Sequence, residues 1–155
     1  MVFRTPKLVK RTRHGIELQL GAEERQLLGG LVAEMRELLR TDDDDPSLRR
    51  LYPTAYPDDP EREAEYQLLA RTELTDHRQQ VLDAMEASLG AKLLDDDQVN
   101  AWVQGINQIR LVLGTRLDVD EDEPEFDPEA ADAPARAVYA YLAMLLDQFV
   151  DALSS

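Results

Sequence analysis

The sequence LDDDQVNAWVQGINQIRLVLGTRL, residues 94–117, carries the clearest structural signal in the chain. Asp95 and Gln98 have the spacing of a capping box, in which the two side chains bond each other's backbone N–H groups at the first turn of a helix. Gly114 lies where a helix commonly ends. Between them, apolar residues recur at steps of three and four, the spacing of one buried helix face: Val99, Trp102, Ile106, Ile109 and Leu113. We therefore predict a helix that begins after Asp95 and ends at Gly114.

Helical patterns also flank this stretch on both sides. Apolar spacing predicts a helix over about 22–40, with acidic residues in its first turn as the helix dipole favours. Pro134 opens a final helix that reaches about Leu153. Residues 41–59 read as a loop rich in Asp and Pro, in which Pro46 is placed to start a short helical turn.

The segment after this loop is helical in its spacing but contains an expected break. Asp59 followed by Pro60 is a start signal, since Asp caps the first turn and Pro is tolerated at the first helical position. Thr72 and Thr75 interrupt the run of good helix formers. The segment is therefore predicted to form two helices, at about 60–71 and 74–90.

The first twenty residues read as a basic β-hairpin. From position 16 onward apolar and polar residues alternate, which is the period of a half-buried strand. His14-Gly15 supplies the predicted turn, because glycine tolerates a positive φ. A two-residue turn would pair Arg11 with Leu18, and a three-residue turn would pair it with Glu17. A lone hairpin is marginally stable in water, so we expect it to lie against the helices.

These patterns predict a mainly α fold, a small bundle of four to five helices with an N-terminal β-hairpin. A chain of 155 residues with 43% hydrophobic content has the length of a single domain and enough apolar residues for a core. Its predicted sections are a basic hairpin arm at 1–20, helices at 22–117, an acidic linker at 118–132 and the C-terminal helix at 133–153.

The composition excludes several classes of function. The chain contains no cysteine, which excludes disulfides, thiolate metal sites, cysteine nucleophiles and thiol redox switches. No apolar run approaches the roughly 18 residues of a membrane-spanning helix. Arg4, Lys7 and Lys10 interrupt any apolar core of a signal peptide. We therefore expect a cytoplasmic protein that does not contact a membrane.

Motifs typical of enzymes are missing from the sequence. There is no glycine-rich phosphate loop, and none of the four serines lies in a nucleophile motif. The 32 acidic residues lie mostly in loops or on polar helix faces, whereas an acid-base pair needs burial that separates two pKa values. We expect a protein that is not an enzyme and holds no cofactor.

Two patterns match metal sites incompletely. Glu73 and His77 share a helix face, but zinc requires more protein ligands than these two. In the linker, Glu123 occupies the position at which a calcium loop needs glycine for its sharp turn. The acidic residues that match ligand positions of such a loop are Asp118, Asp120, Asp122 and Glu129. We therefore predict no metal site.

Charge is distributed unevenly along the chain. The first twenty residues carry a net charge of +4 and the rest carries −19, for a total of −15. Five bases of the arm are candidate partner-binding residues: Arg4, Lys7, Lys10, Arg11 and Arg13. Such a cluster binds phosphates in a salt-dependent way, but the acidic body repels nucleic acid at long range. A protein partner therefore fits the arm better than DNA.

Two strings of the sequence match those of a known family. The first runs from Leu51-Tyr52-Pro53 through Tyr56-Pro57-Asp58-Asp59 to Glu65-Tyr66, and the second runs from Trp102 to Leu117. With the order of hairpin, helices, acidic linker and closing helix, the chain resembles an actinobacterial family catalogued as a domain of unknown function, which includes the AosR oxidative-stress transcriptional regulators. This resemblance implies a small cytosolic helical protein that regulates through partners and has no established catalytic activity.

The resemblance also marks six positions, for which we expect structural roles: Tyr56, Trp102, Asn107, Arg110, Gly114 and Arg116. Trp102 has an indole N–H that needs a partner when it is buried. Asn107 is a candidate for a buried polar group bonded to loop backbone. Arg116 is placed to offset the helix C-terminus and the acidic residues that follow it.

Together these inferences predict a non-enzymatic regulator that binds a protein of the transcription machinery, such as a sigma factor or RNA polymerase. Because cysteine is missing, an oxidant response would require methionine oxidation or another component. Two alternatives stay open. One is direct DNA binding through the arm, and the other is an adaptor role in Clp-type proteolysis, which the resemblance suggests because genes of the family often neighbour that of the Clp adaptor.

Overall fold

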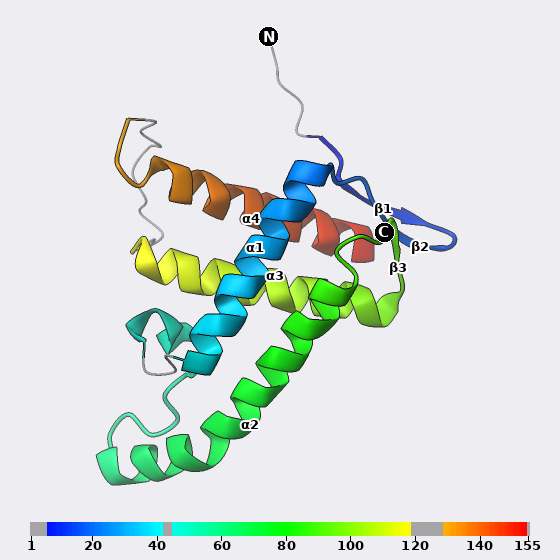
Figure 1. Cartoon of the computed structure of the whole chain (residues 1–155). Helices are drawn as coiled ribbons and strands as arrows, with labels where there is room; N and C mark the ends of the chain where they lie inside the picture. The colour runs from blue at the N-terminus through cyan, green and yellow to red at the C-terminus, as the bar shows by residue number, and fades with distance from the viewer. Residues whose placement is uncertain (1–5, 42–44, 119–128, 155) are drawn as a thin grey trace.

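The computed structural model describes residues 6–41, 45–118 and 129–154 (Figure 1). Its elements are, in chain order, β1 (Val9–Thr12), β2 (Gly15–Leu18), α1 (Ala22–Thr41), the 3₁₀ helix η1 (Pro46–Leu51), α2 (Pro60–Ala87), β3 (Leu93–Leu94), α3 (Asp96–Arg116) and α4 (Ala133–Leu153). Figure 1 shows the hairpin beside the C-terminal end of α4 and one end of α2 extending away from the other helices. The prediction of a mainly α protein with an N-terminal hairpin is confirmed.

Helix α3 is the centre of the fold, packed against η1, α2 and α4. Its predicted capping box is confirmed: Asp95 Oδ1 accepts from the Gln98 N–H, and Gln98 Oε1 accepts from the Asp95 N–H, each at 2.9 Å. Trp102 is fully buried, with its ring centroid 6.0 Å from that of Phe149 on α4. Burying one such side chain contributes about 1.5–3 kcal/mol. The apolar stripe read from the sequence is therefore the core face of α3.

The predicted end of this helix is wrong. Gly114 does not cap α3, which continues to Arg116 and is capped by Leu117. A Cβ atom at position 114 would lie 3.0 Å from Cε2 of Tyr139 on α4. Gly114 is therefore a point of close helix packing and not a stop signal, two roles that a single sequence does not distinguish.

The predicted break in α2 is also wrong, since one helix of 28 residues spans both expected helices. Tyr52, which follows η1, packs along the middle of α2: its hydroxyl lies 2.5 Å from Thr75 Oγ1, and the Arg71 guanidinium lies 4.0 Å from its ring centroid. Arg78 donates to the Leu51 carbonyl at 2.6 Å. These tertiary contacts outweigh the small helix propensity cost of the threonines. The axis of α2 changes direction along its length without interrupting the helix (Figure 1).

The other helices begin and end close to their predicted positions. Helix α1 spans Ala22–Thr41, α4 spans Ala133–Leu153, and the short turn expected at Pro46 is η1. Arg36 joins α1 to α2 through ion pairs with Asp83 and Glu86, both at 2.8 Å. Exposed ion pairs of this kind contribute little to stability, so the packing of α1 depends mainly on its buried apolar face.

The arm forms the predicted hairpin, but its turn and register differ from both alternatives. Thr12 pairs with Gly15 and Arg11 with Ile16, so the turn is Arg13-His14. Gly15 has φ +136°, and a Cβ there would lie 2.6 Å from the Leu94 carbonyl oxygen. The close approach comes from β3, a two-residue strand that pairs with β2 and that the sequence analysis did not find.

One hydrophobic cluster joins the hairpin to the helices. Val9, Ile16 and Leu18 are buried at 1%, 5% and 3% exposure, which confirms that the hairpin lies against the helical body. Among the described residues, no helix is both long enough and apolar enough to cross a membrane. The assignment of the whole chain to a single domain stays a prediction.

Candidate partner-binding groove

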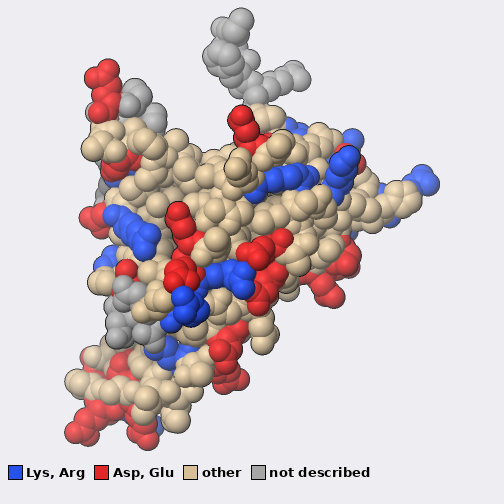
Figure 2. Space-filling model, in the orientation of Figure 1, with Lys and Arg blue, Asp and Glu red and all other residues tan. Residues whose placement is uncertain are grey.

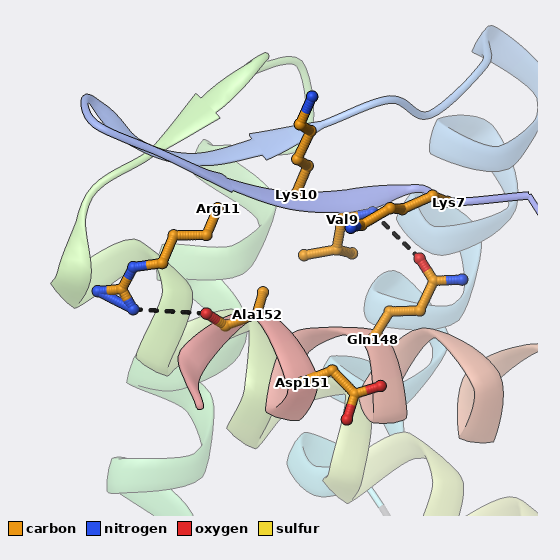
Figure 3. Close-up of a pocket in the computed structure, with 7 residues that line it drawn as sticks. All are labelled: Lys7, Val9, Lys10, Arg11, Gln148, Asp151 and Ala152. Carbon is orange, nitrogen blue, oxygen red and sulfur yellow. Dashed lines mark hydrogen bonds between the residues drawn. The ribbon is translucent and has the colours of Figure 1, made fainter. Parts of the chain in front are cut away.

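A groove of about 600 Å³ lies between β1 and the last turns of α4 (Figure 3). Its lining residues are Lys7, Val9, Lys10, Arg11, Gln148, Asp151 and Ala152. Three bases of the predicted arm therefore line one hollow, together with one acidic residue from α4. This places the groove at the end of the molecule where the hairpin meets the C-terminus of the final helix (Figure 1).

Gln148 holds the arm against α4. Its Oε1 accepts from the backbone N–H of Leu8 at 2.7 Å and of Val9 at 3.1 Å, and its Nε2 donates to the Pro6 carbonyl at 2.8 Å. Val9 is buried beneath these bonds. One side-chain amide thus satisfies three backbone groups at and just before the start of the edge strand β1, a place where unpaired groups would otherwise be exposed.

Arg11 differs from the two lysines in its surroundings. Its Nη1 donates to the Ala152 carbonyl at 3.4 Å, at the negative C-terminal end of α4. Lys7 and Lys10 are exposed, and within the described residues no ion pair to either ammonium group is found. The lysine charges therefore remain exposed at the edge of the groove, with Lys10 pointing away from α4 (Figure 3). The Arg11 guanidinium instead contacts the C-terminal end of α4.

Of the two remaining arm candidates, Arg13 is a described residue and is not part of the groove lining. Arg13 is exposed in the hairpin turn, and Arg4 falls outside the described residues. In Figure 2 the tip of the hairpin carries basic colour and no acidic colour, whereas acidic side chains gather at the free end of α2. The structure thus brings together Lys7, Lys10 and Arg11 of the five predicted residues.

Three of the family-motif positions are packing residues. The Trp102 indole donates to Ser88 Oγ at 2.7 Å, which supplies the partner expected for a buried indole. The Tyr56 ring lies edge-on to Tyr66 at a centroid distance of 6.0 Å. Gly114 provides the close approach to α4 described above.

The polar family-motif positions make contacts within the fold. The expectation that Asn107 bonds loop backbone is wrong, because its Oδ1 accepts from Arg110 Nη2 at 2.9 Å on the same helix. Arg116 Nε donates to Ser47 Oγ at 3.3 Å, and its Nη2 lies 4.0 Å from Asp45 Oδ2. Arg116 therefore joins the end of α3 to the start of η1.

Asp45 and Tyr141 are two of the ionisable groups with shifted pKa values, and neither lines the groove. Hydrogen bonds from the Ser47 hydroxyl and N–H, opposed by partial desolvation and aided by Arg116, lower the pKa of Asp45. Burial, with further contributions from Glu24, raises the pKa of the Tyr141 hydroxyl above its usual range. Both shifts belong to contacts between helices or loops of the fold.

Metal ligands do not converge in the part of the chain that the structure describes, where no group of three or more His, Asp or Glu side chains is placed to hold an ion. His77 instead lies 3.3 Å from Gln104 Oε1, measured from its Nε2. Asp120 and Asp122 of the calcium-loop pattern lie outside the described residues.

The α4 side of the groove consists of Gln148, Asp151 and Ala152, none of which the sequence pattern marked as a candidate. A single glutamine on a mostly apolar helix carries no distinctive pattern. Its role becomes visible only when the hairpin is placed against α4, some 140 residues away in sequence.

Comparison with known proteins places this helical fold in a family. The model of "Domain of unknown function (DUF2017)" matches residues 4–153, and the chain belongs to this family. It is 33% identical to the "Putative oxidative stress regulator AosR" of Mycobacterium leprae over 128 residues, which cover 71% of this chain and 59% of the relative.

The "Oxidative stress regulator AosR" proteins of Mycobacterium bovis and Mycobacterium tuberculosis are each 32% identical over 124 residues. Those residues cover 68% of this chain and 57% of each relative. The chain thus spans less than three-fifths of the length of these relatives. No solved structure matches the chain.

Proposed function

We propose that this protein is a non-enzymatic, cytoplasmic regulator that acts by binding a protein of the transcription machinery, such as a sigma factor or an RNA polymerase subunit. The groove between β1 and α4 is its contact surface. The single observation that carries this proposal is the convergence of Lys7, Lys10 and Arg11 on one hollow of an otherwise acidic protein. Similarity to proteins named oxidative stress regulators supports the regulatory role.

Charge and chain composition favour a protein partner over DNA. The groove contains Asp151 beside its bases, and the chain as a whole carries −15. A nucleic acid would be repelled by this field as it approached, whereas a protein segment contacts only the groove itself. Since the chain has no cysteine, regulation by this protein does not depend on a disulfide switch of its own.

The proposal is tested by affinity capture of partners from native cytosol, with and without nuclease treatment. A sigma factor or polymerase subunit that is retained after nuclease supports it. Loss of all partners on nuclease treatment would indicate binding through DNA, and recovery of protease components would indicate the adaptor role; either result contradicts the proposal.

Variants of the groove residues test whether the captured partner binds at the groove. The double substitution Lys7→Glu and Lys10→Glu is expected to remove the captured partner, because both lysines are exposed residues of the groove lining and neither ammonium group makes an ion pair among the described residues. The matched control is Arg49→Glu with Lys92→Glu, which changes the net charge equally at two exposed positions outside the groove. Equal loss of the partner in both variants would show that net charge, and not the groove, determines binding.

A further inference from the structure

We propose that the groove binds an extended, acidic segment of the partner protein. This inference rests on the proposed function, since it names the chemistry of the partner surface, but it is tested without knowing that partner. The supporting observations are the charges of the lining residues, the direction of the two lysines and the way in which Gln148 covers the strand edge.

The positive charge of the residues that line the groove favours an acidic ligand. Three bases and one acidic residue line the groove. The Ala152 carbonyl, which would repel a carboxylate, already accepts from Arg11. Lys7 and Lys10 are thus available to pair with carboxylates at a partly shielded surface, where charge-assisted hydrogen bonds are stronger than contacts between neutral groups.

The positions of the two lysines favour an extended peptide as the ligand over a single small anion. Lys10 points away from α4, whereas Lys7 lies along the strand near Gln148 (Figure 3). Side chains three residues apart in an extended strand leave opposite faces, and their Cα atoms are about 10 Å apart. A peptide that passes from the groove across β1, with carboxylates spaced along its length, can reach both ammonium groups, whereas one phosphate or one free carboxylate cannot contact both.

Gln148 determines how such a segment is held. Because its amide already accepts from the N–H groups of Leu8 and Val9, these two groups at the start of β1 are not free to pair with an added strand. Recognition therefore depends on side-chain charge above the buried Val9. This makes the interaction sensitive to salt and tolerant of the exact sequence of the segment.

The test measures binding of a short end-blocked peptide of alternating Glu and Val to the full chain, by calorimetry at an ionic strength of about 0.15 M. The charge control is the same peptide with Lys in place of Glu. Further probes are free glutamate, inorganic phosphate and a double-stranded DNA oligonucleotide. We expect the Glu-Val peptide to bind at least about tenfold more tightly than any of these probes.

Two double variants locate the binding site. The double variant Lys7→Gln with Lys10→Gln is expected to bind the Glu-Val peptide about tenfold more weakly, or weaker still. The double variant Arg49→Gln with Lys92→Gln should change the affinity by less than about twofold. Unchanged circular dichroism and thermal midpoint show that each variant is folded. Equal binding of the Lys-Val peptide, tighter binding of DNA or equal weakening by both variants would overturn the proposal.

This result is separable from the regulatory proposal. If the Glu-Val peptide binds the groove and no transcription protein is captured, the acidic-segment inference holds and the proposed function fails. If a sigma factor is captured while no acidic peptide binds, the proposed function holds and this inference fails.

Discussion

Gln148 on α4 accepts the backbone N–H of Leu8 at 2.7 Å, although the two residues are 140 positions apart in the chain. This bond, with those to Val9 and Pro6, fixes the edge of the hairpin to the final helix. One side chain from the other end of the sequence therefore helps to hold the basic arm against α4, the helix that forms the other side of the groove.

Removing the Gln148 amide tests this role. In Gln148→Ala the N–H groups of Leu8 and Val9 lose their acceptor, so we expect their amide hydrogen exchange to accelerate while the amides of α3 stay protected. Native-state exchange measured by NMR checks this. Gln104→Ala is a control, because it removes a half-exposed glutamine outside the groove. Unchanged exchange at Leu8 in Gln148→Ala would show that packing alone holds the arm.

The two glycines Gly15 and Gly30 are expected to respond to alanine in opposite directions. Gly15→Ala places a Cβ 2.6 Å from the Leu94 carbonyl at φ +136°, and we expect a loss of about 1–3 kcal/mol in the free energy of unfolding. Gly30 lies inside α1 with nothing within 4 Å of its Cβ position. Gly30→Ala should therefore raise the stability by about 0.5–1 kcal/mol, through helix propensity. Urea unfolding of both variants measures the difference. Unchanged stability in Gly15→Ala would contradict the close approach to Leu94, and a loss in Gly30→Ala would contradict the open space around that position.

Substitution of an exposed leucine and of a buried leucine by alanine should affect the free energy of unfolding to different extents. Leu68 on α2 is 80% exposed, whereas Leu82 on the same helix is fully buried. Leu68→Ala is expected to change the free energy of unfolding by less than about 0.5 kcal/mol, and Leu82→Ala to lower it by about 2–5 kcal/mol. Thermal unfolding of the two variants checks the contrast. A large loss from Leu68→Ala would mean that α2 has a partner surface in solution, such as a second copy of the chain.

The elements that sequence predicted well are those whose signals are local. The capping box of Asp95 and Gln98 and the apolar stripe through Trp102 fixed the start and the buried face of α3, because both depend on residues within one helix. The hairpin arm and the final helix were found for the same reason. In each case the pattern spans several residues that share one period.

The elements that sequence predicted wrongly are decided by contacts between distant residues. The break expected at Thr75 did not occur, because Tyr52 packs against that turn of α2. The hairpin turn lies at Arg13-His14 and not at the predicted His14-Gly15, because Gly15 pairs with Thr12 and lies against Leu94 of β3. Among the site residues, the bases of the arm were identified by composition, but Gln148 was not, because its role requires knowing which strand faces α4.

The single tryptophan of the chain allows a direct test of a buried hydrogen bond. Trp102 Nε1 donates to Ser88 Oγ at 2.7 Å, and both side chains are buried. Ser88→Ala leaves the indole N–H without this acceptor, and we expect a loss of about 1–3 kcal/mol in the free energy of unfolding. In a Trp102→Phe background the same substitution should cost less. The coupling energy from this double-mutant cycle, measured by urea unfolding with circular dichroism, checks the bond, and a coupling near zero would contradict it.

Asp45 makes the stability of the η1 region depend on pH. Because the Ser47 hydroxyl and N–H lower the pKa of its carboxyl group, the carboxylate stabilises the folded state above the ordinary aspartate pKa of about 3.9. This contribution is lost as the pH falls through the lower pKa of the folded state. In Asp45→Asn the amide still caps η1 but does not titrate. The difference in stability between parent and variant should therefore be constant above about pH 5 and should change only as the solution becomes more acidic. Thermal unfolding from neutral to acidic pH measures it. A difference that instead varies between pH 6 and 8 would show that another group, and not the Asp45 carboxylate, is responsible.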